Sequence, residues 1–458
     1  MTIQQLYDIY LRHPSIRTDT RQLKQGDLFF ALKGPNFNGN AFATRAFELG
    51  AAYAIIDETP ADLPPDASEF SDRLIIVPDV LSTLQELALH HRRQFDIPFI
   101  AITGSNGKTT TKELIHATLA STYTTYTTQG NLNNHIGIPL TILSVGKDAQ
   151  FAVIEMGANH QKEIEAYCRY TLPTHGIITN VGKAHLEGFG GPEGVKKGKG
   201  ELYDFLRSAQ VPAIGSAGTA FVLKDSADLT QMSRGIPHII TYATLDADII
   251  GVIARSEALL KVDITRGAAT GSIQTQLVGD YNLPNVLVAV AVGKHFGVPD
   301  TAIRQAIEQY APSNSRSQLI ERDGLHIILD AYNANPSSMR AAIENFARLP
   351  IPGDTTQSAN SRTPPADPAA SRKVLILGAM AELGPESLAE HQAIIDLIGQ
   401  YSWQQVVLVG GDFRHLSHPY LSFANSKEAG RWLAGVGLKD SYLLIKGSRS
   451  MKMEEVLT

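Results

Sequence analysis

The fold of this 458-residue chain is decided by one stretch, Ala101-Ile102-Thr103-Gly104-Ser105-Asn106-Gly107-Lys108-Thr109-Thr110-Thr111-Lys112-Glu113. An apolar segment from Pro98 to Ile102 precedes its two glycines, and a helical pattern from Thr110 to Leu119 follows them. A glycine-rich turn between a strand and a helix directs backbone N–H groups and the positive end of the helix dipole at one point. The stretch therefore predicts a phosphate site in an α/β domain.

The residues of this loop suit a nucleotide triphosphate. Lys108 can reach the outer phosphates, and the Thr109 hydroxyl can ligate Mg²⁺. The usual P-loop spacing places a glycine at position 102, where this chain has isoleucine, so the motif is a shortened variant. The alternative is a tight turn with a chance Lys-Thr pair, but the strand–turn–helix context favours the phosphate loop. We expect ATP to contact Gly104, Ser105, Asn106, Gly107, Lys108, Thr109 and Thr110.

Composition and charge narrow the classes of function. The hydrophobic fraction of 43% is typical of a globular protein with sizeable cores. A net charge of −6 with intermixed signs leaves no electrostatic footprint for nucleic acid. The single cysteine, Cys168, is expected to be a buried packing thiol in a reducing compartment. With no signal pattern and no apolar run of membrane-span length in the sequence, we expect a cytoplasmic protein without membrane insertion. We also expect the protein to be a monomer.

Three regions follow one another along the chain. Residues 1–97 mix short strands with helices, residues 98–312 carry the phosphate loop, and residues 313–458 alternate strands and helices again. Such alternation is typical of parallel sheets. We therefore predict an α/β protein with a small N-terminal domain, a central P-loop-type ATPase domain and a C-terminal Rossmann-like domain. Residues 352–372 are rich in Pro, Ser, Thr and Ala, which predicts a flexible surface insertion.

Polar side chains follow two predicted strands of the central region. Glu155 ends the strand from Phe151 to Met156, and His185 follows the strand from Gly176 to Asn180. Ligands of parallel sheets gather at the carboxyl ends of the strands, so both side chains are expected near the phosphate loop. A carboxylate there is a natural Mg²⁺ ligand, and the histidine can ligate a second metal. A surface acid and a structural histidine are the alternatives.

A basic run from Gly194 to Leu202 contains Lys199. Taken by itself, the run indicates a solvated start of a helix. Near a triphosphate it can neutralise charge, and a lysine carbamylated by CO₂ would supply a carboxylate for a metal. The residues alone leave these three alternatives open.

Asparagine-rich turns recur at three predicted strand–helix junctions: Gly130 to His135, Gly279 to Asn285 and Asp330 to Pro336. Asparagine both donates and accepts hydrogen bonds, which suits recognition of bases, sugars and amides. It is also a common turn residue, which is the default interpretation of any single one. Three such clusters beside a phosphate loop favour a ligand site.

Together these residues resemble the Mur ligase superfamily over nearly the whole chain. The Asp-Ala-Tyr-Asn-Ala-Asn-Pro string at 330–336 and the Glu-Leu-Gly string at 382–384 resemble the member that adds D-Ala-D-Ala. Among the other shared motifs are Asp19-Thr20-Arg21, Gly104 to Thr110, Asn131 to Pro139, Glu155-Met156-Gly157, Thr179 to Glu187, Lys199-Gly200-Glu201 and Lys446-Gly447-Ser448.

The resemblance implies an ATP-dependent carbon–nitrogen ligase of peptidoglycan precursor synthesis. The carboxylate of UDP-N-acetylmuramoyl-tripeptide would attack the γ-phosphate of ATP, and the amine of D-Ala-D-Ala would then attack the resulting acyl phosphate. Phosphoryl transfer needs positioning and charge neutralisation more than covalent help. Because an acyl phosphate hydrolyses readily, we expect domain closure to exclude water, with hinges near residues 97 and 313.

The resemblance also assigns roles to single residues. Lys108, Glu155, His185 and Lys199 would be catalytic. Thr109 and Glu155 would hold one Mg²⁺, and His185 with a carbamylated Lys199 would help to hold a second. The N-terminal domain would bind the UDP part of the substrate. The nucleotide would meet Asn282, Asn285, Arg316, Asp330 and Asn333, and the UDP-sugar would meet Thr20, Arg21, Asn133 and Asn134.

The chain departs from the family pattern at a few positions. Tyr281 stands where histidine is common, Asn38-Gly39-Asn40 where Asp-Gly-His is expected, and Ala379 where an acidic residue is usual. Three other functions compete: a sibling or folylpolyglutamate-type ligase, a P-loop NTPase switch, and a nucleotide-sugar-binding regulator without catalysis. The 330–336 string argues against the first, the shortened loop against the second, and the retained catalytic set against the third.

Overall fold

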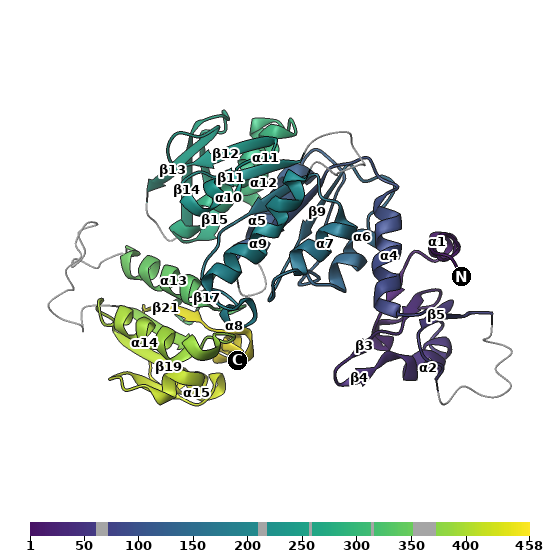
Figure 1. Ribbon diagram of the computed structural model, residues 1–458. Helices are drawn as coiled ribbons and strands as arrows, with labels where there is room; N and C mark the ends of the chain where they lie inside the picture. The colour runs from purple at the N-terminus through teal and green to yellow at the C-terminus, as the bar shows by residue number, and fades with distance from the viewer. Residues whose placement is uncertain (61–71, 209–217, 256–258, 313–315, 351–371) are drawn as a thin grey trace.

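Three large β-sheets succeed one another along the chain (Figure 1). The structure is a computed structural model, and it describes residues 1–60, 72–208, 218–255, 259–312, 316–350 and 372–458. Each sheet lies inside one of the three predicted regions. The domain boundaries at 97 and 312 stay predictions, and the hinge expected near residue 313 and most of the 352–372 insertion lie outside the described residues.

The N-terminal sheet has four parallel strands in the order β1-β2-β5-β6. Neighbouring residues of β2 point to opposite faces, as the period of a strand requires. Phe29 packs with α2, whereas Leu28 and Phe30 pack toward α1 and α4. The elements are α1 (Ile3–Arg12), β1 (Ile16–Arg17), β2 (Leu28–Phe30), the hairpin β3 (Lys33–Gly34) with β4 (Phe37–Asn38), α2 (Ala43–Glu48), β5 (Tyr53–Ile56), β6 (Leu74–Ile76) and α4 (Val80–Arg92).

The central sheet has nine strands in the order β15-β14-β13-β12-β11-β10-β7-β9-β8. All neighbours from β8 to β13 are parallel, and β13, β14 and β15 are antiparallel. The strands are β7 (Phe99–Thr103), β8 (Thr125–Thr127), β9 (Phe151–Glu155), β10 (His175–Ile178), β11 (Thr219–Leu223), β12 (His238–Ala243), β13 (Ile249–Arg255), β14 (Leu259–Arg266) and β15 (Ser272–Val278).

Helices cover both faces of this sheet, which explains why β7 is apolar at every position before Thr103. Ile100 and Ile102 pack with α5 and α11, whereas Phe99 and Ala101 pack toward α6, α7 and α9. The strand β7 therefore lies at the centre of the fold and delivers the phosphate loop. The helices are α5 (Lys108–Ala120), α6 (Gly137–Leu143), α7 (Glu163–Thr171), α8 (Leu186–Phe189), α9 (Pro192–Arg207), α10 (Ala227–Met232), α11 (Leu283–His295) and α12 (Asp300–Gln309).

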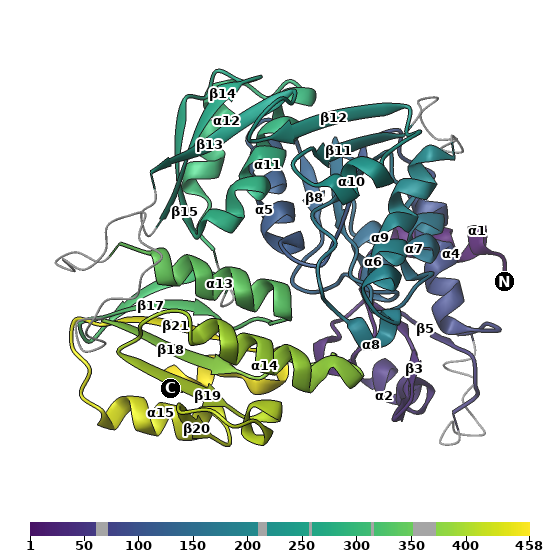
Figure 2. The ribbon, with the colours of Figure 1, turned by 60° about the vertical axis from the view of Figure 1, so that its left-hand side comes forward.

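The C-terminal sheet has the order β16-β17-β21-β18-β19-β20, parallel except for β16. Figure 2 shows α13 and α14 on one side of this sheet and α15 on the other, which is the predicted Rossmann-like layering. The elements are β16 (Gln318–Arg322), β17 (Leu325–Asp330), α13 (Pro336–Arg348), β18 (Lys373–Gly378), α14 (Ser387–Ile398), β19 (Gln405–Val409), β20 (Leu421–Phe423), α15 (Ser426–Gly435) and β21 (Tyr442–Lys446).

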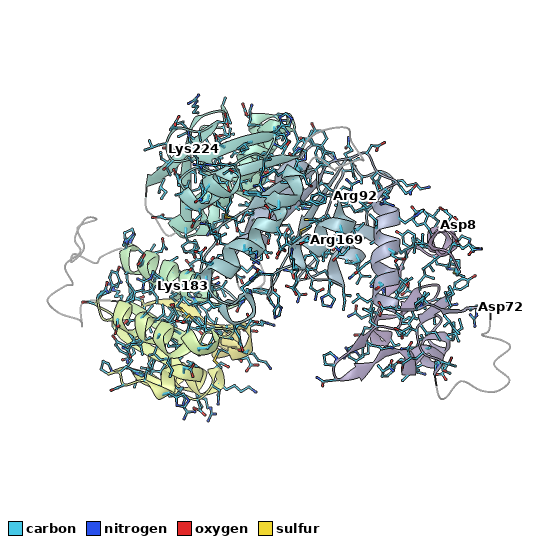
Figure 3. All side chains as sticks on the ribbon, viewed as in Figure 1. Asp8, Asp72, Arg92, Arg169, Lys183 and Lys224 are labelled. Carbon is cyan, nitrogen blue, oxygen red and sulfur yellow. The ribbon has the colours of Figure 1, made fainter. Side chains whose placement is uncertain are left out.

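Helix α4 ties the N-terminal domain to the central domain by means of a fully buried arginine (Figure 3). The Arg92 guanidinium donates to the carbonyls of Phe95 at 2.8 Å, Thr171 at 2.9 Å and Leu172 at 3.0 Å. It also lies 3.9 Å over the ring of Phe99. Burial lowers the pKa of Arg92 to about 10, so the charge is retained at neutral pH. These bonds cap the end of α7 and fix it to the end of α4.

The neighbouring His91 makes the stability of this junction depend on pH. Its Nδ1 lies 3.0 Å from the Tyr7 hydroxyl of α1, and its Nε2 lies 2.9 Å from the Val145 carbonyl. The Val145 carbonyl can only accept, so Nε2 carries a proton, and in the neutral imidazole Nδ1 then accepts from the tyrosine hydroxyl. Burial lowers the pKa of His91 below its ordinary value. Its contribution is therefore complete above about pH 6.5 and is lost as the pH falls below that value.

We expect His91→Gln to flatten the dependence of stability on pH. Between pH 7 and pH 5, wild type should lose on the order of 1 kcal/mol of unfolding free energy more than the variant loses. Urea unfolding at several pH values measures the two slopes. The exposed His160 is the control, and His160→Gln should keep the wild-type slope. Equal slopes in wild type and His91→Gln would contradict the assignment.

Candidate active site

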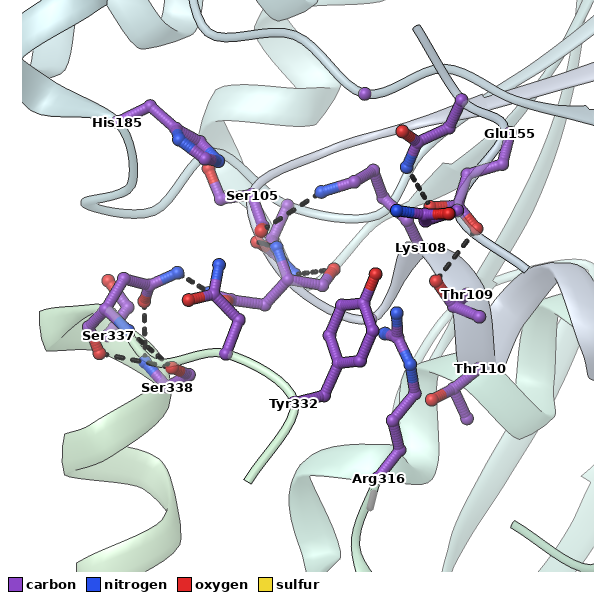
Figure 4. A pocket seen from close by; sticks show the side chains of 18 of the residues that line it. Ser105, Lys108, Thr109, Thr110, Glu155, His185, Arg316, Tyr332, Ser337 and Ser338 are labelled. Carbon is purple, nitrogen blue, oxygen red and sulfur yellow. Dashed lines mark hydrogen bonds between the residues drawn. The ribbon is translucent and has the colours of Figure 1, made fainter. Parts of the chain in front are cut away.

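A cleft of about 580 Å³ lies where the carboxyl ends of several parallel strands meet (Figure 4). The phosphate loop follows β7, Glu155 ends β9, His185 follows β10, and Asp330 ends β17 of the C-terminal sheet. The topology thus brings together polar side chains that are separated by up to half of the chain. The predicted strand ends and all three asparagine clusters contribute residues to the lining of this cleft.

Most of the predicted site residues line the cleft, and four do not. Gly104 is buried within the loop, and Lys199 is buried beneath the lining residue Ala158. Thr20 and Arg21 lie in the N-terminal domain outside the cleft, where Arg21 is paired with Asp19. Those that line it are Ser105, Asn106, Gly107, Lys108, Thr109, Thr110, Asn133, Asn134, Glu155, His185, Asn282, Asn285, Arg316, Asp330 and Asn333.

Two asparagine side chains, one in α11 and one in the turn before it, lie behind the phosphate loop. Gly107 caps α5 with a φ of 77°, and a Cβ there would lie 2.9 Å from Asn285 Oδ1. That same oxygen accepts from the Thr111 hydroxyl at 3.0 Å, and Asn285 Nδ2 donates to Asn282 Oδ1 at 2.8 Å. The side-chain amides of both asparagines therefore already have hydrogen-bond partners within the protein. The predicted role of Asn282 and Asn285 near adenine stays a prediction.

Lys108 is folded back over its own loop. Its ammonium donates to the carbonyl of Gly104 at 2.7 Å and to that of Ser105 at 3.3 Å. Burial lowers the pKa of Lys108, and the charge of Arg316 acts in the same direction, whereas Glu155 opposes both. The ammonium thus lies among carbonyls at the loop that would receive the phosphates, where its charge is available to them.

Thr109 and Glu155 form the arrangement expected of a magnesium site. The Thr109 hydroxyl donates to Glu155 Oε2 at 2.8 Å, and Asn133 Nδ2 donates to Oε1 at 2.7 Å. Glu155 is 1% exposed, so its carboxylate is held in place by these bonds away from bulk water. Within the described ranges, no three His, Cys, Asp or Glu side chains gather around one point. These residues fit a Mg²⁺ that takes its remaining ligands from phosphates and water.

Lys199 is a buried amine on α9. Its side chain is fully buried, its Nζ donates to the Ala158 carbonyl at 3.1 Å, and the ring of Phe189 lies 4.9 Å away. Burial lowers the pKa of Lys199 well below its usual range, and the charge of Lys108 adds to this effect. The solvated helix start, which was one alternative for the basic run, is wrong for this residue.

The loop that carries His185 contacts the C-terminal domain. His185 Nδ1 contacts a carboxylate oxygen of Glu382, and both residues have left-handed backbone with φ of 53° and 61°. Lys183 lies where the central and C-terminal domains meet (Figure 3), and its Nζ is 2.5 Å from Glu390 Oε1. Sequence reasoning included Glu382 in a motif without a role. Its contact with His185 depends on how two domains dock, for which the local sequence carries no signal.

The C-terminal domain brings cations and amides to the opposite wall. Arg316 lies 3.5 Å over the ring of Tyr332, and Figure 4 shows the pair in the middle of the cleft. Lys446 Nζ lies 2.5 Å from Asp330 Oδ2. Asn335 Nδ2 donates to Asn106 Oδ1 at 2.7 Å, which joins this wall to the phosphate loop. Fold and cleft together define an ATP-dependent enzyme whose nucleotide-binding central sheet faces a second parallel-sheet domain.

Comparison with known proteins narrows this class. The models of the Mur ligase family match three segments: the catalytic domain model residues 14–92, the middle domain model residues 102–293, and the glutamate ligase domain model residues 315–449. The UDP-N-acetylmuramoyl-tripeptide–D-alanyl-D-alanine ligase of Bacillus subtilis is 31% identical over 452 residues, covering 96% of this chain and 92% of the relative. The enzyme of that name from Escherichia coli is 31% identical over 474 residues, covering 100% and 97%.

Solved structures agree with this grouping. MurF from Acinetobacter baumannii superimposes with a TM-score of 0.82 at 28% identity, covering 100% of this chain and 97% of that one. The fold is shared with MurF from Thermotoga maritima in complex with ADP, at a TM-score of 0.80 and 24% identity over 98% and 97% of the two chains. The chain belongs to the Mur ligase family and is an ATP-dependent amide ligase. Among the described residues, no helix is long and apolar enough to cross a membrane.

Proposed function

We propose that this chain joins D-Ala-D-Ala to UDP-N-acetylmuramoyl-tripeptide at the expense of ATP, giving the UDP-pentapeptide precursor of peptidoglycan. The observation that carries the proposal is the cleft in which the phosphate loop, Glu155 and the C-terminal Asp330 face one another. Full-length relatives that bear the name of this ligase support the choice of substrates. The free, buried Cys168 accords with a reducing cytoplasm, where we propose that the enzyme works as a monomer.

The residues of the cleft would position two successive attacks. Loop amides and Lys108 hold the phosphates while the tripeptide carboxylate attacks the γ-phosphorus and ADP leaves. The amine of D-Ala-D-Ala then attacks the acyl carbon and phosphate leaves. Arg316 and Lys446 reach the site only from the C-terminal domain. Docking of that domain would therefore complete the charge around the reacting phosphate and exclude water.

Two magnesium ions are part of this proposal. Thr109 and Glu155 would hold one of them, since their oxygens already lie within 2.8 Å of each other. His185 and Lys199 would help to hold the other, which requires His185 to exchange its contact with Glu382. Such ions neutralise the charge that builds up on the transferring phosphoryl group. The chain itself would supply two ligands to the first ion, the buried carboxylate of Glu155 at the end of β9 and the hydroxyl of Thr109 in the first turn of α5.

Lys199 suits carbamylation because its surroundings favour the neutral amine. Only an unprotonated amine attacks CO₂, and burial lowers the pKa of Lys199 in the required direction. The amine adds to the carbon of CO₂ and releases a proton, so a carbamate anion replaces a neutral amine near Lys108. The carbamate would attract the Lys108 ammonium and supply a carboxylate ligand.

The UDP end of the substrate is assigned to residues on two domains. Asn133 and Asn134 lie in the lining of the cleft, and Asn134 Oδ1 accepts from the backbone of Gly137 at the start of α6. Thr20 and Arg21 lie in the N-terminal domain, where the Arg21 side chain is 87% exposed. An exposed arginine on a small domain suits a pyrophosphate, which would have to compete with the Asp19 carboxylate that now pairs with Arg21.

Phosphate release tests the proposed function. We expect release from ATP and Mg²⁺ only when UDP-N-acetylmuramoyl-tripeptide and D-Ala-D-Ala are both present, with a UDP-pentapeptide detected by mass spectrometry. A requirement for another amino acid in place of D-Ala-D-Ala would instead indicate a sibling ligase. Release that ignores both substrates would indicate a plain NTPase.

A further inference from the structure

Tyr281 lines the cleft but has no part in the proposed reaction. It belongs to a short 3₁₀ turn, η3 (Asp280–Asn282), between β15 and α11. Its hydroxyl lies 3.1 Å from Ser317 Oγ, across the boundary between the central and C-terminal domains. Ser317 in turn donates its backbone N–H to Asp330 Oδ1 at 3.1 Å. A continuous chain of hydrogen bonds therefore runs from η3 to the end of β17.

The ring of Tyr281 is held in one place by its own turn. Gly279 has a φ of 95°, and a Cβ there would lie 2.4 Å from Tyr281 Cε1, so only glycine leaves room for the ring. Burial raises the pKa of Tyr281, which keeps the hydroxyl protonated. A second bond beside it runs in the same direction, from the Asp280 N–H to Asn345 Oδ1 of α13 at 3.1 Å.

The other side of η3 is bonded to the phosphate loop. Asn282 follows Tyr281 directly, and its side chain accepts from Asn285, which accepts from Thr111 of α5. Side chains of η3 thus connect α5, the helix after the phosphate loop, to the C-terminal domain. A displacement of one would be transmitted to the other through Tyr281.

The far end of this connection carries the residues proposed for the nucleotide. Ser317 has left-handed backbone with a φ of 47°, a conformation that a serine keeps only when its surroundings impose it. Its neighbour Arg316 lies over Tyr332, and its partner Asp330 is paired with Lys446. A bond that fixes Ser317 therefore fixes the direction in which Arg316 enters the cleft.

We propose that the Tyr281 hydroxyl is a positioning group for the nucleotide, acting through Ser317 to set Arg316 and Asp330 against the phosphate loop. The inference rests on the proposed ATP site and names a residue that determines its affinity. Histidine is common at this position in the family that the chain resembles, but an imidazole is shorter than a phenol. A histidine here would not reach Ser317 from the same backbone.

The test is Tyr281→Phe, which removes only the hydroxyl. From the ordinary contribution of one hydrogen bond, we expect the Kd for ADP and the KM for ATP to rise about three- to tenfold. The KM for D-Ala-D-Ala and the melting temperature should stay at their wild-type values. Tyr281→His should behave like Tyr281→Phe. Tyr123→Phe is the matched control, because that hydroxyl donates to the Phe296 carbonyl at 2.7 Å, outside the cleft lining.

A double-mutant cycle with Ser317→Ala separates positioning from general destabilisation. If the two hydroxyls act through each other, the double variant should bind ADP no more weakly than either single variant. Additive losses, or an unchanged Kd for ADP in Tyr281→Phe, would overturn the proposal. Because calorimetric ADP binding needs no turnover, this failure is distinct from failure of the proposed function, which appears as a wild-type enzyme that makes no UDP-pentapeptide.

Discussion

Replacing Lys108 by methionine is expected to lower kcat/KM for ATP by roughly 10²- to 10³-fold, the usual loss when one preorganised charge at a reacting centre is removed. The ammonium of Lys108 already lies within hydrogen-bond distance of two loop carbonyls. It needs only a change of side-chain torsions to turn toward a phosphate. Methionine keeps the length of the side chain and removes the charge, so the loss would report on electrostatics rather than on packing.

The loop itself should survive this change. Its shape is set by Gly107 and by the Asn285 amide behind it, neither of which contacts the Lys108 ammonium in the bonds described above. Release of ADP in a coupled assay gives kcat and KM, and calorimetry gives the melting temperature. Lys147→Met, at an exposed position after α6, is the control and should be fully active. A Lys108→Met enzyme within threefold of wild type would remove Lys108 from the reaction.

Topology explains why part of the cleft could be predicted from the sequence. Parallel strands deliver their carboxyl ends to one edge, so a glutamate at the end of β9 and a histidine after β10 had to lie near the loop after β7. That argument needs only that the strands run parallel in one sheet, which the alternation of strands and helices along the chain predicts. It reaches Glu155 and His185, which both line the cleft. Asp330 also lines the cleft, but it ends a strand of the C-terminal sheet and lies there because the two domains dock.

The helical spacing of apolar residues around Lys199 predicts that this residue is buried, although it belongs to a basic run. The buried positions Val195, Leu202 and Leu206 are spaced around Lys199 by four, three and seven residues, which places all of them on one face of α9. Helical spacing therefore assigns Lys199 to the apolar face, although its neighbours Lys196 and Lys197 belong to the solvated one.

Contacts between domains had no such signal. The pairs His185–Glu382 and Tyr281–Ser317 join residues of two different domains, and they exist because the central and C-terminal domains dock in one orientation. Strand order within each sheet does not determine that orientation. Likewise, Thr20 and Arg21 were assigned by resemblance alone, and their distance from the cleft leaves their role a prediction.

Lys199→Met is expected to reduce ligase activity by on the order of a thousandfold while the protein stays folded. The lysine is fully buried, and its pKa is lowered by burial, so the folded chain accommodates it at a cost. A methionine of similar volume removes the buried amine without opening a cavity, so we expect the melting temperature to be kept or raised. Loss of activity without loss of stability would separate a chemical role from a structural one.

The control for this substitution is Lys197→Met, since Lys197 lies on the same helix and is exposed. It should keep wild-type activity. Carbamylation itself predicts a carbonyl signal in the ¹³C NMR spectrum of wild type equilibrated with ¹³CO₂, absent from Lys199→Met and present in Lys197→Met. It also predicts that removing bicarbonate lowers wild-type activity and that adding it back restores the rate. If Lys199→Met is inactive but wild type shows neither the signal nor the bicarbonate dependence, Lys199 acts as an unmodified buried amine, and the second metal must take its carboxylate from elsewhere.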